Sequence, residues 1–262
     1  MSFLQVQKRR IEYEFIHVAS ADAPIIVFLH EGLGSVSMWK DFPSQVAHAT
    51  GCNALVYSRY GYGQSDPLQG PRRADFMHEE ALRALPELLD QLGVEMPIMF
   101  GHSDGGSIAL IHAAAAQRQV AGVIVMAPHV MVENVAITSI QAAQRAYETT
   151  DLRVKLSRHH ADPDSAFRGW NDIWLHADFR HWNIEALLPS ITCPVLAIQG
   201  EDDEYGTMEQ IEQIARLARD VDLLKLTDCR HSPHRDQPKA VVEATTRFID
   251  RLRDVSRAGS PP

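Results

Sequence analysis

The chain has 262 residues, and its 25 basic and 34 acidic side chains give a formal net charge of −9 at pH 7. Because phosphate groups are bound by basic surfaces, this balance argues against a nucleic-acid partner. No run of about 18 apolar residues is present, so no membrane span is expected. The N-terminal sequence lacks the apolar stretch of a signal peptide, and the three cysteines form no spaced framework, which predicts a cytoplasmic protein.

Short apolar runs alternate with longer helical patterns along most of the chain. A β-hairpin is expected over residues 3–7 and 11–18. Five later apolar runs are expected to be strands buried on both faces, at 24–30, 54–57, 96–101, 122–127 and 194–200, and residues 221–226 are expected to form the last strand. Helical periodicity lies between them, over 72–92, 107–117, 209–218 and 240–252. This order predicts an α/β fold with a doubly wound, mostly parallel eight-stranded sheet.

Residues 132–188 interrupt this alternation. They contain three helical patterns in succession, over 138–150, 152–160 and 165–175, with no strand pattern between them. We therefore expect a helical insertion that lies over the sheet. The core would consist of residues 1–131 and 189–256, and residues 257–262 would form a disordered tail.

The most informative segment is G-x-S-x-G, which begins at Gly101 and places Ser103 at its centre. An apolar strand pattern precedes it and a small-residue helix pattern follows it, which is the setting that a nucleophilic serine requires. The alternative is a glycine-rich turn without chemistry. A phosphate-binding loop is disfavoured because its glycine spacing and terminal lysine are missing. The pattern therefore predicts Ser103 as a nucleophile.

A serine nucleophile needs a base, and the base needs an orienting carboxylate. Four acidic residues, 201–204, follow a late strand, and we favour Asp203 over Asp202 as the orienting group. Two histidines follow the last strand, and we favour His231 over His234 as the base. This order of serine, acid and histidine is the one found when a serine of this type lies between a strand and a helix.

Other nucleophiles and ligands are less well supported. Cys229 lies beside His231 but lacks the strand–turn–helix setting. Histidines in the insertion could suggest a metal, but no cysteine or carboxylate spacing completes a site. These are His159, His160, His176 and His181. We expect neither a metal nor a cofactor.

An acyl-transfer site also needs donors for the negative oxygen of its intermediate. The loop after the strand at 24–30 contains Gly32 and Gly34 and can supply one backbone N–H group. The residue after the nucleophile, Asp104, supplies the second.

Five segments together resemble the α/β-hydrolase fold superfamily: FLHEGLGS (28–35), SRYGYGQSD (58–66), GHSDGG (101–106), IQGEDDEYG (198–206) and CRHSPHRDQP (229–238). The resemblance implies a Ser103–Asp203–His231 triad, an oxyanion hole formed by the N–H groups of Gly32 and Asp104, and a helical cap. The sequence departs from the usual pattern at Ser58, Tyr60 and Arg230. Glu31 interrupts the usual His-Gly pair, so the register of the oxyanion loop is open between Glu31, Gly32 and Leu33. A carboxylate there could also repel anionic substrates.

We expect a serine hydrolase of the carboxylesterase type that acts on a small-molecule acyl substrate. His129 and Tyr205 are candidate pocket residues, as are Trp170 and Trp174, although the tryptophans could simply pack the insertion onto the core. Carbon–carbon hydrolases, lactonases, thioesterases, aminopeptidases, hydroxynitrile lyases and cofactor-free dioxygenases remain alternatives, as does a non-catalytic ligand receptor. Asp-dependent dehalogenases and epoxide hydrolases are disfavoured by Ser103. A homo-oligomer is compatible with the sequence.

Overall fold

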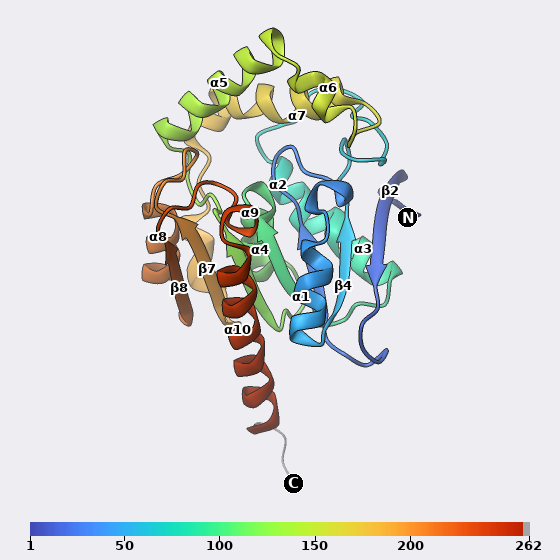
Figure 1. Cartoon of the computed structure of the whole chain (residues 1–262), viewed down its shortest axis with the longest axis vertical. Helices are drawn as coiled ribbons and strands as arrows, with labels where there is room; N and C mark the ends of the chain where they lie inside the picture. Colours follow the sequence, from blue (N-terminus) through green and yellow to red (C-terminus); the bar gives the residue numbers. More distant parts are fainter. Residues whose placement is uncertain (259–262) are drawn as a thin grey trace.

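An eight-stranded sheet forms the centre of the computed structural model, which describes residues 1–258, with side chains to residue 254 (Figure 1). The strand order is β1-β2-β4-β3-β5-β6-β7-β8. The β1–β2 and β2–β4 pairs are antiparallel and the remaining pairs are parallel. The strands are β1 Ser2–Val6, β2 Arg9–Ile16, β3 Ile25–Leu29, β4 Asn53–Tyr57, β5 Ile98–His102, β6 Gly122–Met126, β7 Val195–Gly200 and β8 Val221–Leu226. The predicted fold class is confirmed.

The continuous apolar runs are explained by cores on both faces of the sheet. Along β3, Val27 and Leu29 join one buried cluster, whereas Ile26 and Phe28 join the other. Successive side chains of a strand point to opposite faces, so only an uninterrupted apolar run can fill two cores. The first cluster packs under α4 (Asp104–Ala115) and α8 (Glu209–Leu217), and the second under α1 (Phe42–Thr50) and α10 (Pro238–Ala258).

Two helical regions differ from the prediction. Helix α1 had no counterpart in the predicted elements; it is short and carries Pro43 in its first turn. The helix expected over 72–92 instead comprises α2 (Phe76–Glu79), a π-helical turn (Glu80–Ala84) and α3 (Leu85–Gln91). Pro86 has no N–H group and its ring excludes the carbonyl four residues earlier, so the regular hydrogen-bond ladder is broken there.

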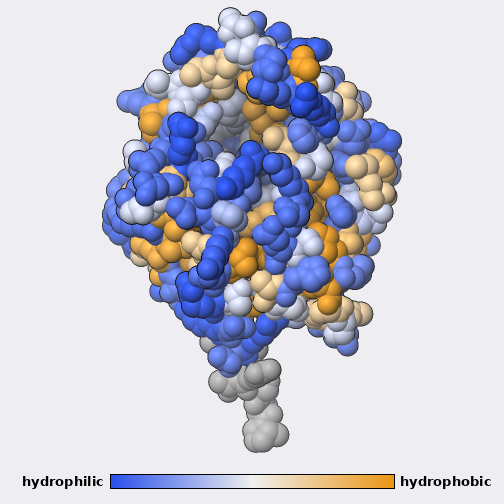
Figure 2. All heavy atoms as spheres, viewed as in Figure 1, coloured by the Kyte–Doolittle hydropathy of each residue, from blue (hydrophilic) through white to orange (hydrophobic). Residues whose placement is uncertain are grey.

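The segment 132–188 contains α5 (Asn134–Thr149), α6 (Leu152–Leu156) and α7 (Pro163–Leu175), followed by 3₁₀ turns at Ala177–His181 and Glu185–Ser190. These helices lie across one end of the sheet, at the top of Figure 1. Figure 2 shows that the surface is hollowed beneath them and that hydrophilic residues are interspersed with hydrophobic ones over this face.

His160 fastens this helical segment to the core. Its imidazole accepts a hydrogen bond from the Gly63 N–H (2.9 Å) and donates one to the Leu33 carbonyl (2.9 Å). The two contacts join loops that follow two different strands, β3 and β4. Gly169 of α7 also packs against Leu68, since a methyl group on that glycine would lie 2.3 Å from the leucine side chain.

The chain ends in the long helix α10, which continues to Ala258 and so passes the boundary expected at residue 256. Residues 259–262 of the expected tail lie outside the described part of the chain. Within residues 1–258, no helix is both long and apolar enough to span a bilayer.

Ser103 joins β5 to α4. The loops singled out from the sequence follow parallel strands, so they lie together at the carboxyl ends of those strands.

The packing of α4 against β3 gives a stability prediction. A methyl group on Gly105 would lie 2.0 Å from the backbone oxygen of Leu29, whereas one on Gly106 would lie 3.1 Å from the Pro128 side chain. We expect Gly105→Ala to lower the free energy of unfolding by about 3 kcal/mol or more, because a backbone carbonyl cannot move aside. Gly106→Ala is the matched control and should cost about 1 kcal/mol or less, since alanine also favours the helix. Urea unfolding measures both, and equal stabilities of the two variants would contradict this packing.

Candidate active site

Ser103 occupies the sharp turn between β5 and α4. Its backbone angles are φ 51° and ψ −121°, a left-handed conformation that a non-glycine residue seldom adopts. Gly101 and Gly105 make the turn feasible, because a Cβ on Gly101 would lie 2.3 Å from the Gly105 carbonyl oxygen. The side chain of Ser103 therefore projects from the end of the strand, at the start of a helix whose first N–H groups are unpaired.

The structure brings Ser103, His231 and Asp203 together in a single hydrogen-bonded chain. The Nε2 atom of His231 lies 3.0 Å from the Ser103 hydroxyl, and its Nδ1 atom lies 2.8 and 3.0 Å from the two carboxylate oxygens of Asp203. An ionised carboxylate only accepts hydrogen bonds, so Nδ1 carries the proton and Nε2 is free to accept from the serine hydroxyl. This geometry permits proton removal from Ser103.

Asp203 is held by its own loop. Its Oδ1 atom accepts from the N–H groups of Tyr205 (2.8 Å) and Gly206 (3.3 Å), and its Oδ2 atom accepts from the Gln199 side chain (2.7 Å). Burial opposes ionisation of Asp203, but the positive charge and hydrogen bond of His231 outweigh it and lower the pKa of this carboxyl. Asp202 is exposed instead, and only its backbone N–H is engaged here, with the Cys229 carbonyl. The acid favoured from the sequence is the one beside His231.

The backbone of His231 is fixed by a residue that the sequence analysis did not select. His102, at the end of β5, donates from Nε2 to the His231 carbonyl over 2.7 Å. The other ring nitrogen of His102 lies 3.6 Å from a carboxylate oxygen of Glu31, whose second oxygen lies 3.7 Å from Arg235. Glu31 thus lies between two basic side chains, and its effect on anionic substrates stays a prediction. Burial opposes its ionisation, but the neighbouring imidazole of His102 and the guanidinium of Arg235 hold the pKa of Glu31 well below its usual range.

A buried arginine fixes the oxyanion loop. The guanidinium of Arg59 donates to the carbonyl oxygens of His30 (3.1 Å) and Glu31 (2.8 Å), and no described acidic side chain lies within ion-pair distance of it. The peptide bonds are trans, so the N–H groups of Glu31 and Gly32 point away from Arg59. Among the described residues, none accepts a hydrogen bond from the N–H of Gly32 or of Asp104. Both groups are therefore available as donors.

His129 also lies beside Ser103, with its ring 5.9 Å from that of His231. Its Nε2 atom is 3.5 Å from the serine hydroxyl, and its backbone N–H and carbonyl are both bonded to the Ser107 hydroxyl (3.1 and 2.6 Å). Burial, followed by the nearby charge of His231, lowers the pKa of His129 to about 3. The ring is therefore neutral at pH 7 and does not compete with His231 for a proton.

The other expected pocket residues surround the same point. Trp170 packs on Gly32, since a methyl group on that glycine would lie 2.2 Å from the indole ring. Trp174 donates from its indole nitrogen to the Asp104 carboxylate (3.1 Å), and burial raises the pKa of that carboxyl. The ring of Tyr205 lies 4.7 Å from that of His231. Both tryptophans are more than nine-tenths buried, so they also attach α7 to the core.

The alternatives considered from the sequence are placed elsewhere. His234 packs against Trp39 (5.1 Å between ring centroids) and does not contact Ser103. Burial raises the pKa of Cys229 to about 12, so this thiol is protonated at neutral pH. His159 is bonded to the Ser37 hydroxyl (2.9 Å). Within residues 1–254, no group of three or more His, Cys, Asp or Glu side chains is arranged to hold a metal ion.

The buried histidines give a pH prediction. Burial is the largest cause of a lowered pKa for five of them, which are His30, His112, His129, His160 and His234. Their pKa values lie below the unfolded value of about 6.5, so the unfolded chain binds more protons. Their contribution to stability is therefore complete above pH 6.5 and is lost as the pH falls toward the folded values. Each should add roughly 1 kcal/mol per pH unit to the slope of unfolding free energy against pH.

Urea unfolding between pH 7.5 and 4.5 measures this slope. His234→Phe removes one such group, whose Nδ1 has no described partner and whose pKa is lowered to about 2. The variant should show a shallower slope by roughly 1 kcal/mol per pH unit. His181→Phe, at an exposed position, is the control and should leave the slope unchanged. A stability that is constant from pH 7 to 5 in the unaltered protein would contradict the burial of neutral imidazoles.

Comparisons with known proteins identify the family and support the fold. The sequence model of the alpha/beta hydrolase family matches residues 26–244. The chain is 23% identical to the sn-1-specific diacylglycerol lipase ABHD11 of Mus musculus, over 87% of this chain and 82% of that protein. It is 21% identical to a proline iminopeptidase of Saccharolobus solfataricus, over 77% of each chain.

Among solved structures, a thermophilic esterase from Thermogutta terrifontis superposes with a TM-score of 0.76 at 17% identity, covering 96% of this chain and 99% of that one. At this identity the structural likeness demonstrates the fold alone. The family match extends from β3 into α10 and includes Ser103, Asp203 and His231. The chain is therefore a member of the alpha/beta hydrolase family.

Proposed function

We propose that this protein is a serine hydrolase that cleaves a small carboxylic ester through an acyl-enzyme. The observation that carries the proposal is the hydrogen-bonded chain from Ser103 through His231 to Asp203. Ser103 would be the nucleophile, His231 the general base and Asp203 the group that orients the imidazole. All three lie at the carboxyl ends of parallel strands, where ligands bind in open α/β sheets.

In the first step His231 takes the hydroxyl proton of Ser103 while the serine oxygen attacks the ester carbonyl. The tetrahedral intermediate breaks down when His231 returns that proton to the leaving alcohol, which leaves an acyl group on Ser103. In the second step His231 removes a proton from water, and the resulting nucleophile attacks the acyl-enzyme. Protonation of Ser103 by His231 then releases the carboxylic acid and restores the enzyme.

The negative oxygen formed in each step would be stabilised by the N–H groups of Gly32 and Asp104. Support for this role comes from the absence of described hydrogen-bond acceptors for these two groups and from the helix that begins at Asp104. Arg59 would act as a positioning residue, because it binds the carbonyl of the peptide unit that carries the Gly32 N–H. Removal of one such donor from a comparable site costs about 3–4 kcal/mol of transition-state stabilisation.

We further propose that residues 132–188 form a cap that limits the size of the acyl group. The support is the contact of Trp170 with Gly32 and of Trp174 with Asp104, both of which lie next to the reacting serine. His129 would contact the substrate as a neutral hydrogen-bonding group. Ester, thioester, lactone and aminoacyl bonds are all compatible with this triad, and a panel of acyl chains and leaving groups, with kcat/KM for each, distinguishes them.

The nucleophile assignment predicts that Ser103→Ala lowers kcat for p-nitrophenyl acetate by about 10⁵- to 10⁶-fold. The variant should also lose labelling by a fluorophosphonate. Its unfolding free energy should stay close to that of the unaltered protein, because alanine removes no described hydrogen bond of the core. Near-normal turnover in Ser103→Ala would disprove the assignment. Tight ligand binding without turnover or labelling in the unaltered protein would instead indicate a receptor.

The acid assignment is tested by a matched pair of neighbours. Asp203→Asn should lower kcat by about 10⁴-fold, because an amide no longer fixes the tautomer in which Nε2 accepts a proton. Asp202→Asn removes the same charge one residue away, and it should leave kcat within about twofold, since the Asp202 side chain is exposed. Steady-state kinetics on both variants make the comparison. Equal losses of kcat in the two variants would show that the loop at residues 201–204 contributes only its overall negative charge.

A further inference from the structure

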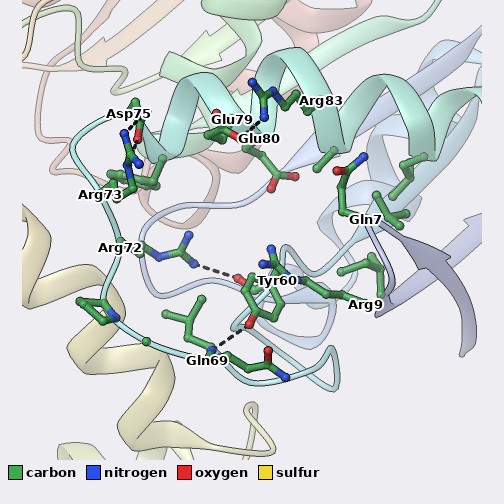
Figure 3. A pocket seen from close by; sticks show the side chains of 18 of the residues that line it. Gln7, Arg9, Tyr60, Gln69, Arg72, Arg73, Asp75, Glu79, Glu80 and Arg83 are labelled. Atoms are coloured by element: carbon green, nitrogen blue, oxygen red, sulfur yellow. Dashed lines mark hydrogen bonds and ion pairs between the residues drawn. The ribbon is translucent and has the colours of Figure 1, made fainter.

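A cavity of about 790 Å³ lies outside the region of Ser103 (Figure 3). Its walls come from the β1–β2 hairpin, the end of β4, the segment 68–73 and the helix that begins at Phe76. Ser103, Asp203 and His231 belong to other loops, those after β5, β7 and β8. A volume of this size falls in the range of about 300–1,000 Å³ that is usual for small-molecule sites.

Part of the cavity wall is apolar. Val6, Ile11, Phe76 and Leu88 line it, and each of them is more than nine-tenths buried. Tyr60 also lines the cavity, and its hydroxyl accepts a hydrogen bond from the Gln69 N–H (2.8 Å). Apolar side chains beside polar ones favour a ligand that combines a hydrocarbon or aromatic body with a polar group.

Two of the arginines that line the cavity have no acidic partner. Arg9 lies flat over the Tyr60 ring, with its guanidinium carbon 3.7 Å from the ring centroid. Arg72 donates to the Tyr60 carbonyl (2.8 Å), and its Nε atom is buried without a hydrogen-bond partner. Among the side chains described for residues 1–254, neither guanidinium is paired with a carboxylate. Both approach Tyr60, from opposite sides (Figure 3).

The remaining charges of the cavity are already engaged. Arg73 is paired with Asp75 (3.3 Å), and Arg83 with Glu79 (3.4 Å). Glu80 accepts a hydrogen bond from the buried Tyr57 hydroxyl (2.8 Å), and burial, followed by the Glu80 charge, raises the pKa of that hydroxyl well above its usual value. Four arginines against three carboxylates leave one positive charge in excess, although the chain as a whole carries −9.

The helix that lines the cavity is irregular at the same place. Its π-helical turn covers Glu80–Ala84, and Glu80, Arg83 and Ala84 all line the cavity. Turns of this type are rare and occur frequently at functional sites. Here the turn alters the direction in which Glu80 and Arg83 leave the helix, relative to a regular α-helix.

We propose that this cavity binds an aromatic monocarboxylate, with its carboxylate beside Tyr60 and within reach of Arg9 and Arg72, and with its ring against the apolar side chains of the cavity wall. A guanidinium pairs with the planar carboxylate through two parallel hydrogen bonds, and the single excess charge matches a single negative charge. This site is separate from the proposed acyl-transfer site and does not depend on it.

Calorimetric titration with 2-naphthoate tests the proposal on the full chain. Neutral 2-naphthamide should bind at least tenfold more weakly, because it cannot form a charge-assisted pair with the arginines. Arg9→Gln and Arg72→Gln should each weaken 2-naphthoate binding at least tenfold. Arg10→Gln is the matched control: Arg10 is the next residue of β2, also lies over an aromatic ring (Phe3, 4.6 Å), and does not line the cavity. It should change the affinity by less than twofold.

Five results would overturn the proposal. One is the absence of 2-naphthoate binding at millimolar concentration, and another is equal affinity for the acid and the amide. A third is equal weakening by Arg9→Gln and Arg10→Gln, which would indicate attraction to general surface charge. Unchanged binding in Arg9→Gln would place the ligand elsewhere, including near Ser103. A dianion, 2-naphthyl phosphate, should bind no more tightly than 2-naphthoate, and a tenfold preference for it would exclude a carboxylate site. Urea unfolding of each variant verifies that it is folded.

Discussion

The left-handed backbone of Ser103 is the constraint on which the rest of the site depends. The chain must leave β5 and begin α4 within one residue, so the serine side chain is projected away from both elements. Gly101 and Gly105 allow strand and helix to approach closely enough for this turn, and Gly105 in turn rests against the carbonyl of Leu29 at the end of β3. Ser103 and the loop after β3, proposed as nucleophile and oxyanion loop, are thereby held close together by backbone contact.

Polar contacts between neighbouring loops complete this arrangement. Glu31 lies in the loop after β3, His102 directly precedes Ser103, and Arg235 follows His231 in the chain. The Glu31 carboxylate is the shared partner, 3.6 Å from His102 and 3.7 Å from Arg235. Arg59 binds the oxyanion loop from its other side. One ionised carboxylate thus connects three segments that are far apart in the chain. Because His102 and Arg59 are buried, loss of a partner there would leave a buried polar or charged group unsatisfied.

Much of this architecture could be predicted from the sequence, for definable reasons. Uninterrupted apolar runs specify strands buried on both faces, and the alternation with helices specifies their parallel order. The segment around Ser103 could be identified because the glycines of the G-x-S-x-G pattern permit a tight turn and its serine supplies the hydroxyl group. Asp203 and His231 followed from their places after late strands, and the structure brings both to Ser103. These are local patterns that act through short-range geometry.

What could not be predicted depends on side-chain direction or on contacts between distant segments. His102 lies in the selected motif, but nothing in the sequence indicates that its ring reaches the His231 carbonyl. The contact of Glu31 with Arg235 could not be predicted, because the two residues are about two hundred positions apart in the chain. The π-helical turn before Pro86 was missed because helical periodicity does not distinguish a local widening of the helix. A proline inside an apolar periodic segment was the one available signal.

The central claim is that Ser103 carries an acyl group during turnover. Rapid acid quenching after mixing the enzyme with p-nitrophenyl acetate, followed by mass spectrometry of the digested protein, tests it most directly. The account predicts an acetyl group on the peptide that contains Ser103, appearing together with the first equivalent of p-nitrophenol. Turnover with no acyl group on that peptide, or with the group on another residue, would contradict it.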